Sequence, residues 1–357
     1  MEPDQLEFDK VRHHNTKIDN TCLHRQANNN NGDNIMTDNT LADRFQQLEN
    51  WLDSRIIGQP KLVNRLLIAL LADGHLLVEG APGLAKTRAI KTLSDAVEGD
   101  FHRIQFTPDL LPSDITGTDI YRPQDGSFVF EQGPIFHHMI LADEVNRAPA
   151  KVQSALLEAM AERQVSIGKK TYPLPELFLV MATQNPLEQE GTYPLPEAQL
   201  DRFLLHVNVD YPDAVSELAI LRAVRNENRH SQQPNPPLLS QADLFQARKQ
   251  VLDMHMDDAV EHYIVQLVIA TRQAAAYSES LADSIEYGVS PRASIALDSC
   301  ARAHAWLQGK DYVSPDDVQA VLHDVFRHRL ILSFTAEANG LGKDEVISQL
   351  LQQVPVA

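Results

Sequence analysis

The chain has 357 residues and a formal net charge of −18, and 43% of its residues are hydrophobic. That length allows two domains of ordinary size, and the composition is that of a globular protein. An acidic chain lacks the basic surface that dominates affinity for nucleic-acid phosphates, so we expect a protein partner in preference to a nucleic acid. The sequence has no run of about 18 apolar residues and therefore predicts no membrane span.

The compartment is indicated by the cysteines and by the N-terminus. Cys22 and Cys300 stand far apart in unlike contexts and do not form a disulfide framework. So few cysteines favour a reducing environment. The first residues have neither the basic start nor the apolar core of a secretory signal. We therefore expect a cytoplasmic protein.

Residues 1–40 are rich in asparagine and poor in large apolar side chains. Such a segment buries too little surface to offset the entropy lost on ordering, so we predict a disordered tail. His13, His14, Cys22 and His24 lie within it, but their spacing matches no zinc-binding pattern.

Beyond Thr40, helical and extended patterns alternate. Apolar residues recur at helical spacing over 41–52 behind the Thr40 cap, and again after Pro60, which predicts two helices. Short apolar runs separated by helical stretches then predict the buried strands of a parallel sheet with both faces covered. These strands are expected at 75–80, 101–106, 137–142, 177–182 and 203–209.

Two hairpins interrupt this alternation. Residues 120–133 contain Asp125-Gly126 between extended segments, which is a strong hairpin signal. Residues 163–175 form a weaker one around Gly168. Neither is needed to complete the sheet, so we interpret both as projecting contact elements.

After about Asp210 the strand pattern stops and helices follow. A proline-rich linker at 231–240 interrupts them, and Ser-Pro pairs at Ser290 and Ser314 predict two helix starts. The predicted fold is thus an α/β domain with a parallel sheet and two hairpin inserts, followed by an all-α domain. The expected boundaries are 1–40 for the tail, 41–210 for the α/β domain, 211–335 for the helical domain and 336–357 for a C-terminal helical tail.

The segment GAPGLAKT, Gly80 to Thr87, differs from the phosphate-binding signature G-x-x-x-x-G-K-[ST] only at Ala85. Backbone N–H groups of this loop and of the following helix would surround phosphate oxygens, Lys86 would reach the terminal phosphates, and Thr87 would ligate Mg²⁺. Ala85 is acceptable if its φ is negative, because a Cβ is penalised only at positive φ. The alternative is a glycine-rich turn without a ligand. We expect an ATP site that includes Gly80, Ala81, Pro82, Gly83, Leu84, Ala85, Lys86 and Thr87.

Polar residues follow two of the predicted strands. Asp143 and Glu144 come directly after the strand at 137–142, at the edge where open α/β sheets bind ligands. Asp143 can hold Mg²⁺, and Glu144 can polarise the attacking water. Asn185 would lie beside Asp143 and position the γ-phosphate and water, although Asn-Pro is also a turn signal.

Two arginines complete the set of candidate site residues. Arg202 is interpreted as an arginine finger that reaches the γ-phosphate of a neighbouring subunit. The alternative is a surface ion pair with Glu197 or Asp201. Arg292 stands in the first turn of a predicted helix, where a cation opposes the helix dipole, and this favours a phosphate-binding role.

In this order, the segments closely resemble the MoxR family of AAA+ ATPases. The resemblance runs from about Leu41 to Leu332 and rests on IIGQ, GAPGLAKT, FTPDLLPSDITG, FEQGPIF, DEVNRAPAKVQSALLEAMAERQVSIG, ATQNP, PLPEAQLDRF and SPRA. The family also has Ala-Lys-Thr, which implies that Ala85 belongs to a working site. The implied roles are Walker A for Lys86 and Thr87, Walker B for Asp143 and Glu144, sensor 1 for Asn185, arginine finger for Arg202 and sensor 2 for Arg292.

The resemblance also implies an adenine-side contact at Ile57 and Gly58, and a second arginine, Arg147, that faces the neighbouring subunit. It implies that the two hairpins are the helix-2 and pre-sensor-1 inserts. Such proteins form homo-oligomeric rings, usually hexamers, with ATP and Mg²⁺ between subunits. They act as chaperone-like ATPases that mature, activate or insert metal into a client enzyme, often with a von Willebrand factor A domain protein.

Two other functions stay open at this point. Minichromosome maintenance helicases share the sheet, inserts and finger, so a nucleic-acid-remodelling motor is one alternative. It requires basic inserts, whereas the second hairpin offers Lys169 and Lys170 and the first offers Arg122 against Asp125 and Glu131. The other alternative is a nucleotide-gated scaffold that does not hydrolyse ATP, although all catalytic positions are filled.

Overall fold

The computed structural model describes residues 40–187, 191–227 and 235–356. The predicted disordered tail lies outside them except for Thr40, and so does the group of histidines with Cys22. The proline-rich linker predicted at 231–240 is described only from residue 235 onward.

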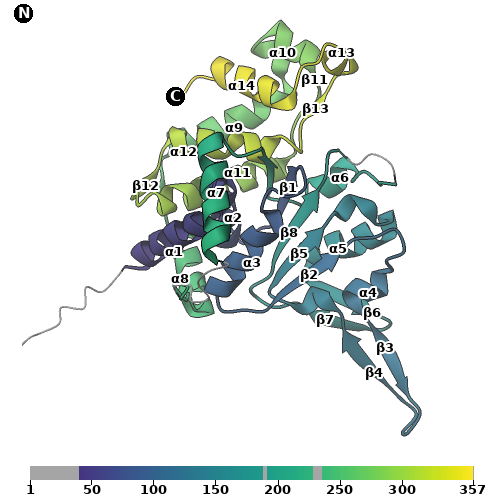
Figure 1. Ribbon diagram of the computed structural model, residues 1–357. Helices are drawn as coiled ribbons and strands as arrows, with labels where there is room; N and C mark the ends of the chain where they lie inside the picture. The colour runs from purple at the N-terminus through teal and green to yellow at the C-terminus, as the bar shows by residue number, and fades with distance from the viewer. Residues whose placement is uncertain (1–39, 188–190, 228–234, 357) are drawn as a thin grey trace, which may run out of the picture. The chain divides into compact units, whose positions relative to one another are not determined.

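A five-stranded parallel sheet forms the centre of the α/β part (Figure 1). The strand order is β2-β5-β8-β1-β9, and every neighbouring pair is parallel. All five strands expected from the apolar runs are confirmed. Their bounds are β1 Leu76–Gly80, β2 Phe101–Gln105, β5 Met139–Asp143, β8 Leu179–Gln184 and β9 Leu205–Val209.

Both faces of the sheet are buried. On β1, Leu76 and Val78 belong to one hydrophobic core, whereas Leu77 belongs to another on the opposite face. This alternation explains why the inner strands β5, β8 and β1 read as nearly continuous apolar runs, since successive side chains point to opposite faces and both faces are covered there. Figure 1 shows α3 and α5 on opposite sides of the strands.

Helices precede the sheet and connect its strands. Thr40 caps the first of them through a reciprocal pair of hydrogen bonds with Asp43, which confirms the predicted start. Their bounds are α1 Leu41–Arg55, α2 Pro60–Leu71, α3 Lys86–Ala96, α4 Pro112–Thr116, α5 Ala150–Glu162 and α6 Glu197–Leu200, with short 3-10 turns η1 Pro134–Phe136 and η2 Val145–Arg147.

Both predicted hairpins are confirmed. The first pairs β3 Gly117–Arg122 with β4 Ser127–Gln132, and the second pairs β6 Gln164–Ile167 with β7 Lys170–Pro173. The two hairpins touch, because the rings of Phe130 and Tyr172 stack with their centroids 4.1 Å apart. Tyr121 and Phe128 of the first hairpin are more than half exposed.

The part of the chain after Asp210 is dominated by helices, as predicted, but it also contains short strands. β10 His255–Met256 pairs with β12 Tyr312–Val313, and β11 Ile285–Tyr287 pairs with β13 Ile331–Leu332. The expectation that strands end at Asp210 is wrong in this detail, since pairs of two or three residues are too short for periodicity to reveal. The helices are α7 Ala214–Glu227, α8 Gln241–Leu252, α9 Asp258–Arg272, η3 Ala274–Ala276, α10 Glu279–Ser284, α11 Pro291–Leu307, α12 Pro315–Phe326, α13 Phe334–Ala338 and α14 Lys343–Gln353.

Buried charges join these helices to the sheet. Arg327, which follows α12, donates to the backbone oxygen of His206 on β9 and pairs with Asp324 at 2.8 Å. Asp324 also binds Arg65 of α2 at 2.8 Å. Burial opposes ionisation of Asp324, but the neighbouring guanidinium groups outweigh it and hold the pKa of that carboxyl below its usual value. The domain boundaries expected at 210 and 335 stay predictions.

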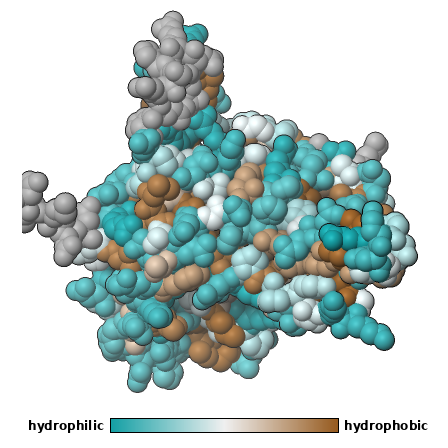
Figure 2. Space-filling view, turned by 90° about the horizontal axis from the view of Figure 1, so that it is seen from below, coloured by the Kyte–Doolittle hydropathy of each residue, from teal (hydrophilic) through white to brown (hydrophobic). Residues whose placement is uncertain are grey.

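The surface seen in Figure 2 is mainly hydrophilic, and its hydrophobic residues form several separate groups. Within the described ranges, no helix is both long and apolar enough to cross a membrane.

Candidate nucleotide site

The glycine-bearing loop lies between β1 and α3, at the carboxyl end of the sheet, as predicted. β1 ends at Gly80, and α3 begins at Lys86. A Cβ on Gly80 would lie 2.6 Å from the backbone oxygen of Val209 on β9, so only glycine permits this close approach. Gly83 has a φ of +85°, and a Cβ there would meet nothing within 4 Å. The loop therefore presents its backbone to open space beside a helix N-terminus, which is the arrangement that binds phosphate.

Ala85 does not meet the condition of a negative φ under which alanine is free of strain. Its φ is +58° and its ψ is 15°, in the left-handed region. A Cβ in this region costs about 1 kcal/mol relative to glycine, so the residue that departs from the signature is a strained one. The alanine does not select a relaxed backbone here. Instead, the turn from β1 into α3 imposes the conformation on whatever residue stands there.

Lys86, Thr87, Asp143, Glu144 and Asn185, predicted as site residues, line one cavity. Lys86 Nζ donates to the backbone oxygen of Gly80 and, at 3.4 Å, to that of Gln184, so the ammonium lies between the ends of β1 and β8. The cavity has a volume of about 400 Å³. It is lined by Pro82, Gly83, Ala85, Lys86, Thr87, Arg88, Arg103, Asp143, Glu144, Thr183 and Asn185.

Asp143, the last residue of β5, is buried and both of its carboxylate oxygens accept hydrogen bonds. Oδ1 accepts from Thr183 Oγ1 at 2.6 Å. Oδ2 accepts from the guanidinium of Arg103, with N–O distances of 2.6 and 3.0 Å. Sequence reasoning identified neither Thr183 nor Arg103 as a partner of Asp143. Both contacts depend on the order β2-β5-β8, which sequence order does not reveal.

Glu144 also has a left-handed backbone, with a φ of +57°. Its carboxylate accepts hydrogen bonds from Gln105 Nε2 at 2.7 Å and from Arg147 Nη1 at 2.9 Å. Its own N–H donates to Thr183 Oγ1 at 2.9 Å. Non-glycine residues in this conformation cluster at functional sites, where the surroundings hold them in place. Arg147, implied to face a neighbouring subunit, contacts Glu144 of its own chain here.

Asn185 follows β8 and is buried at the same edge. Because Ala142 is in register with Ala182, Thr183 stands level with Asp143, and Asn185 lies two residues further on. Its Oδ1 accepts from the N–H of Leu187 at 3.1 Å. The turn role and the cavity-lining role considered for Asn185 therefore coexist.

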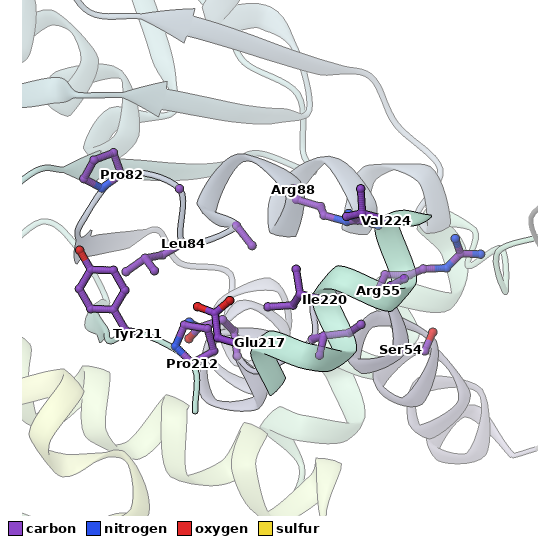
Figure 3. A pocket seen from close by; sticks show the side chains of 15 residues that line it. Ser54, Arg55, Pro82, Leu84, Arg88, Tyr211, Pro212, Glu217, Ile220 and Val224 are labelled. Atoms are coloured by element: carbon purple, nitrogen blue, oxygen red, sulfur yellow. The ribbon is translucent and has the colours of Figure 1, made fainter. Parts of the chain in front are cut away.

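A second cavity of about 360 Å³ adjoins the loop (Figure 3). Figure 3 shows Leu84, Pro212 and Ile220 converging on it, with the carboxylate of Glu217 directed inward. Ile57 lines it, as the resemblance implies, whereas Gly58 is not among its lining residues. The full lining is Ser54, Arg55, Ile57, Gln59, Pro82, Gly83, Leu84, Ala85, Arg88, Tyr211, Pro212, Glu217, Ile220, Ala223 and Val224.

The contribution of α7 to this cavity was missed by sequence reasoning. Gly58 has a φ of +81°, and a Cβ there would lie 2.9 Å from the Cβ of Pro212 and 3.0 Å from that of Ser216. Glycine at this position therefore allows the start of α7 to approach. The mostly apolar lining beside a phosphate loop suits a flat heterocyclic base.

Arg202 and Arg292 line a different cavity from the loop residues. This arginine cavity, of about 390 Å³, also receives Arg163 and Arg329. Arg202 Nη1 donates to the backbone oxygen of Leu157 at 2.7 Å. In the described part of the chain, no ion pair joins Arg202 to Glu197 or Asp201.

Asp201 lies at the centre of the arginine cavity's hydrogen bonds. Its carboxylate accepts from Arg329 Nε at 2.8 Å and from Ser290 Oγ at 3.0 Å. Arg292, whose side chain is 58% exposed, lies 3.8 Å from it. Burial lowers the pKa of Arg329, and the hydrogen bond that its guanidinium donates to Asp201 opposes that shift. Asp201 thus ties the segment that carries Arg202 to the start of α11.

The residues at the loop offer oxygen ligands that suit Mg²⁺ bound together with a nucleoside triphosphate. Thr87 and Asp143 offer a hydroxyl and a carboxylate oxygen, which are the ligand types that Mg²⁺ prefers alongside phosphate and water. Among the described residues, no cluster of three or more His, Cys, Asp or Glu side chains could hold a metal ion without such help. A hydroxyl and one carboxylate would leave further coordination positions for phosphate oxygens and water.

Comparison with known proteins agrees with this geometry. Residues 75–205 match the model of the ATPase family associated with various cellular activities, and residues 279–350 match the AAA lid domain. A crystal structure of a candidate ATPase from Cytophaga hutchinsonii superposes with a TM-score of 0.82 at 47% identity, covering 89% of this chain and 96% of that one.

Curated relatives narrow the family. The chain is 48% identical to Chaperone MoxR1 of Mycobacterium tuberculosis over 84% of this chain and 78% of that protein. It is 42% identical to YeaC of Bacillus subtilis, over 84% of this chain and 91% of that protein. It is 34% identical to Protein MoxR of Paracoccus denitrificans, over 83% of this chain and 92% of that protein. The fold, the loop with its acidic pair and these relatives agree, and the chain belongs to the MoxR family of AAA+ ATPases.

Proposed function

We propose that the protein hydrolyses ATP at the interfaces of a head-to-tail ring and uses the energy to remodel a partner protein. The observation that carries this proposal is the separation of the two cavities. The loop cavity contains the acidic pair and Lys86, whereas Arg202 and Arg292 line another cavity. An arginine that cannot reach its own chain's phosphates can reach those of the next subunit if the interface is head-to-tail and closes on itself.

The loop cavity contains most of the groups that the reaction requires. N–H groups of the loop and the Lys86 ammonium bind the phosphates, and Thr87 and Asp143 would hold Mg²⁺, which supplies positive charge to the phosphate oxygens. Glu144 orients the attacking water once its carboxylate leaves Gln105 and Arg147. The Asn185 amide lies at the same edge and fixes the water or the γ-phosphate.

The arginine cavity supplies the remaining charge from the neighbouring copy. Because Arg292 lies beside Arg202 and not beside the loop, we assign both to the nucleotide of the next subunit. This differs from a sensor that closes on its own chain's nucleotide. The adenine side is served instead by Ile57, Gly58 and the apolar side of α7.

The remodelled partner is a protein in this proposal. The relative from M. tuberculosis is named a chaperone. The first hairpin presents Tyr121 and Phe128, whose ring centroids are 5.2 Å apart, and its nearby charges are mostly acidic. Exposed aromatic side chains on an acidic element suit a polypeptide better than a nucleic acid. A hexameric ring, a von Willebrand factor A domain protein and a client enzyme complete the proposal, together with a cytoplasmic location.

Subunit mixing tests the ring mechanism. Arg202→Ala should lower ATP turnover by about a thousandfold or more, since arginine fingers contribute that much elsewhere. Glu144→Gln should be similarly inactive. In a mixture of the two variants, some interfaces join the intact acidic pair of one subunit to the intact Arg202 of another, so activity should reappear.

The matched control is Arg202→Ala mixed with the double variant Arg202→Ala/Glu144→Gln, which restores no such interface. Turnover per subunit should also rise with protein concentration. If the first mixture stays inactive while the protein assembles, the trans role of Arg202 is wrong.

A further inference from the structure

Arg103 makes a contact that the proposed reaction does not use. It lies on β2, the edge strand next to β5, and its side chain extends along the strand to Asp143. Its Nε and Nη2 lie 3.0 and 2.6 Å from the same oxygen, Asp143 Oδ2. Nη2 also donates to Gln105 Oε1 at 2.8 Å, which fixes the guanidinium in place.

This contact competes with a metal ion. Asp143 Oδ1 accepts one hydrogen bond, from Thr183, whereas Oδ2 accepts both hydrogen bonds from the Arg103 guanidinium, so Arg103 competes with a cation for Oδ2. Mg²⁺ binds carboxylate oxygens at about 2.0–2.1 Å and carries two positive charges. A guanidinium at 2.6 Å from the same oxygen and a metal ion exclude each other by space and by charge.

The guanidinium has somewhere to go when it leaves Asp143. The Arg103 side chain is 49% exposed and lines the same cavity as Lys86 and Thr87. A nucleotide would bring phosphate oxygens there, which are good partners for both the released arginine and Mg²⁺. Mg²⁺ without nucleotide brings only further positive charge.

We propose that Arg103 is a positioning residue that holds Asp143 until metal and nucleotide displace it together, so that the protein takes up the metal only with nucleotide. This rests on the proposed assignment of Asp143 as a metal ligand. Arg103 therefore lowers the affinity of the site for metal and makes that affinity conditional on phosphate.

Direct metal binding tests the proposal without measuring turnover. Mn²⁺ serves as the probe, because the electron paramagnetic resonance signal of the free ion reports binding. The full chain is titrated with and without ADP, as wild type, Arg103→Gln, Arg103→Lys and Arg122→Gln, and a titration of ADP without protein gives the Mn²⁺ that the free nucleotide binds. Arg122→Gln makes the same change in net charge on the first hairpin and serves as the control.

We expect wild type to bind Mn²⁺ with ADP and not without it. In the presence of ADP, Arg103→Gln should bind Mn²⁺ about tenfold more tightly than wild type, because one charged hydrogen-bond partner of Asp143 is removed. In the absence of ADP, Arg103→Gln should bind Mn²⁺ measurably. Arg103→Lys should fall between, and Arg122→Gln should match wild type. Because Arg103 is half exposed, the variant should retain its thermal midpoint, which circular dichroism checks.

Two results would overturn the proposal in distinguishable ways. If wild type binds Mn²⁺ with ADP but Arg103→Gln binds it equally or more weakly, Arg103 does not compete with the metal. If wild type binds no Mn²⁺ even with ADP, the assignment of the metal site itself is wrong.

Discussion

The loop cavity and the arginine cavity are built in different ways. The loop cavity collects residues that directly follow three neighbouring strands, so its parts come together wherever a parallel sheet of this order forms. The arginine cavity is held by contacts between distant segments, above all the pair between Asp201 and Arg329. The first has carboxylates, a lysine and a phosphate-binding loop, whereas the second is mainly basic. Each lacks what the other provides, which is why we assign them to two subunits of one site.

Glu144→Gln should have the largest effect on turnover and tests the catalytic role of the loop cavity. The amide cannot polarise water, so turnover should fall by roughly a thousandfold, within the range for loss of a general base. ATP binding should persist, because no loop residue changes. A fluorescent ATP analogue would measure affinity, and phosphate release would measure turnover. Glu131→Gln on the exposed first hairpin is the control, and near-normal turnover of Glu144→Gln would rule out its role.

The corresponding test of the arginine cavity is Asp201→Asn. Removing the charge that pairs with Arg329 leaves a buried guanidinium without its counter-ion, so the free energy of unfolding should fall by about 3 kcal/mol. Chemical denaturation would measure this loss.

Asp201→Asn also separates the two cavities by their function. Nucleotide affinity should change little, since Asp201 lines neither the loop cavity nor the second cavity beside it, while turnover should fall because Arg202 and Arg292 lose their common anchor. If affinity falls and turnover at saturation does not, the arginine cavity does not serve catalysis.

Ala85→Gly should give the smallest effect. Relief of the left-handed Cβ stabilises the folded chain by about 1 kcal/mol, and the greater freedom of glycine in the unfolded chain offsets part of this. We expect a small gain or no change in the thermal midpoint with ATP affinity retained. Asp73 also has a positive φ, +53°, and Asp73→Gly relieves the same kind of backbone strain at a position away from the loop. That substitution also removes the ion pairs of Asp73 with Arg163 and Arg248, which Ala85→Gly does not. A clear loss of stability in Ala85→Gly would show that the alanine methyl contributes packing that outweighs its strain.

Local patterns in the sequence were sufficient to predict many of the secondary-structure elements. Nearly continuous apolar runs identified four of the five strands, because a strand buried on both faces needs apolar residues throughout. The fifth, the edge strand β2, has only scattered apolar residues and is partly exposed. Asp125-Gly126 identified the first hairpin, since few pairs of residues accept its turn. The loop at Gly80 and the acidic pair at Asp143 were also found, because each directly follows such a strand.

Contacts between segments were decided only by the tertiary structure. Arg103 contacts Asp143 because β2 lies next to β5. Residues of α7 line the second cavity beside the loop because Gly58 allows the start of α7 to approach. Arg292 lies beside Arg202 because Asp201 draws α11 toward the end of α6. A sequence pattern reports the period and burial of one element, which local backbone geometry controls. It does not report which elements become neighbours, because that depends on packing of the whole core.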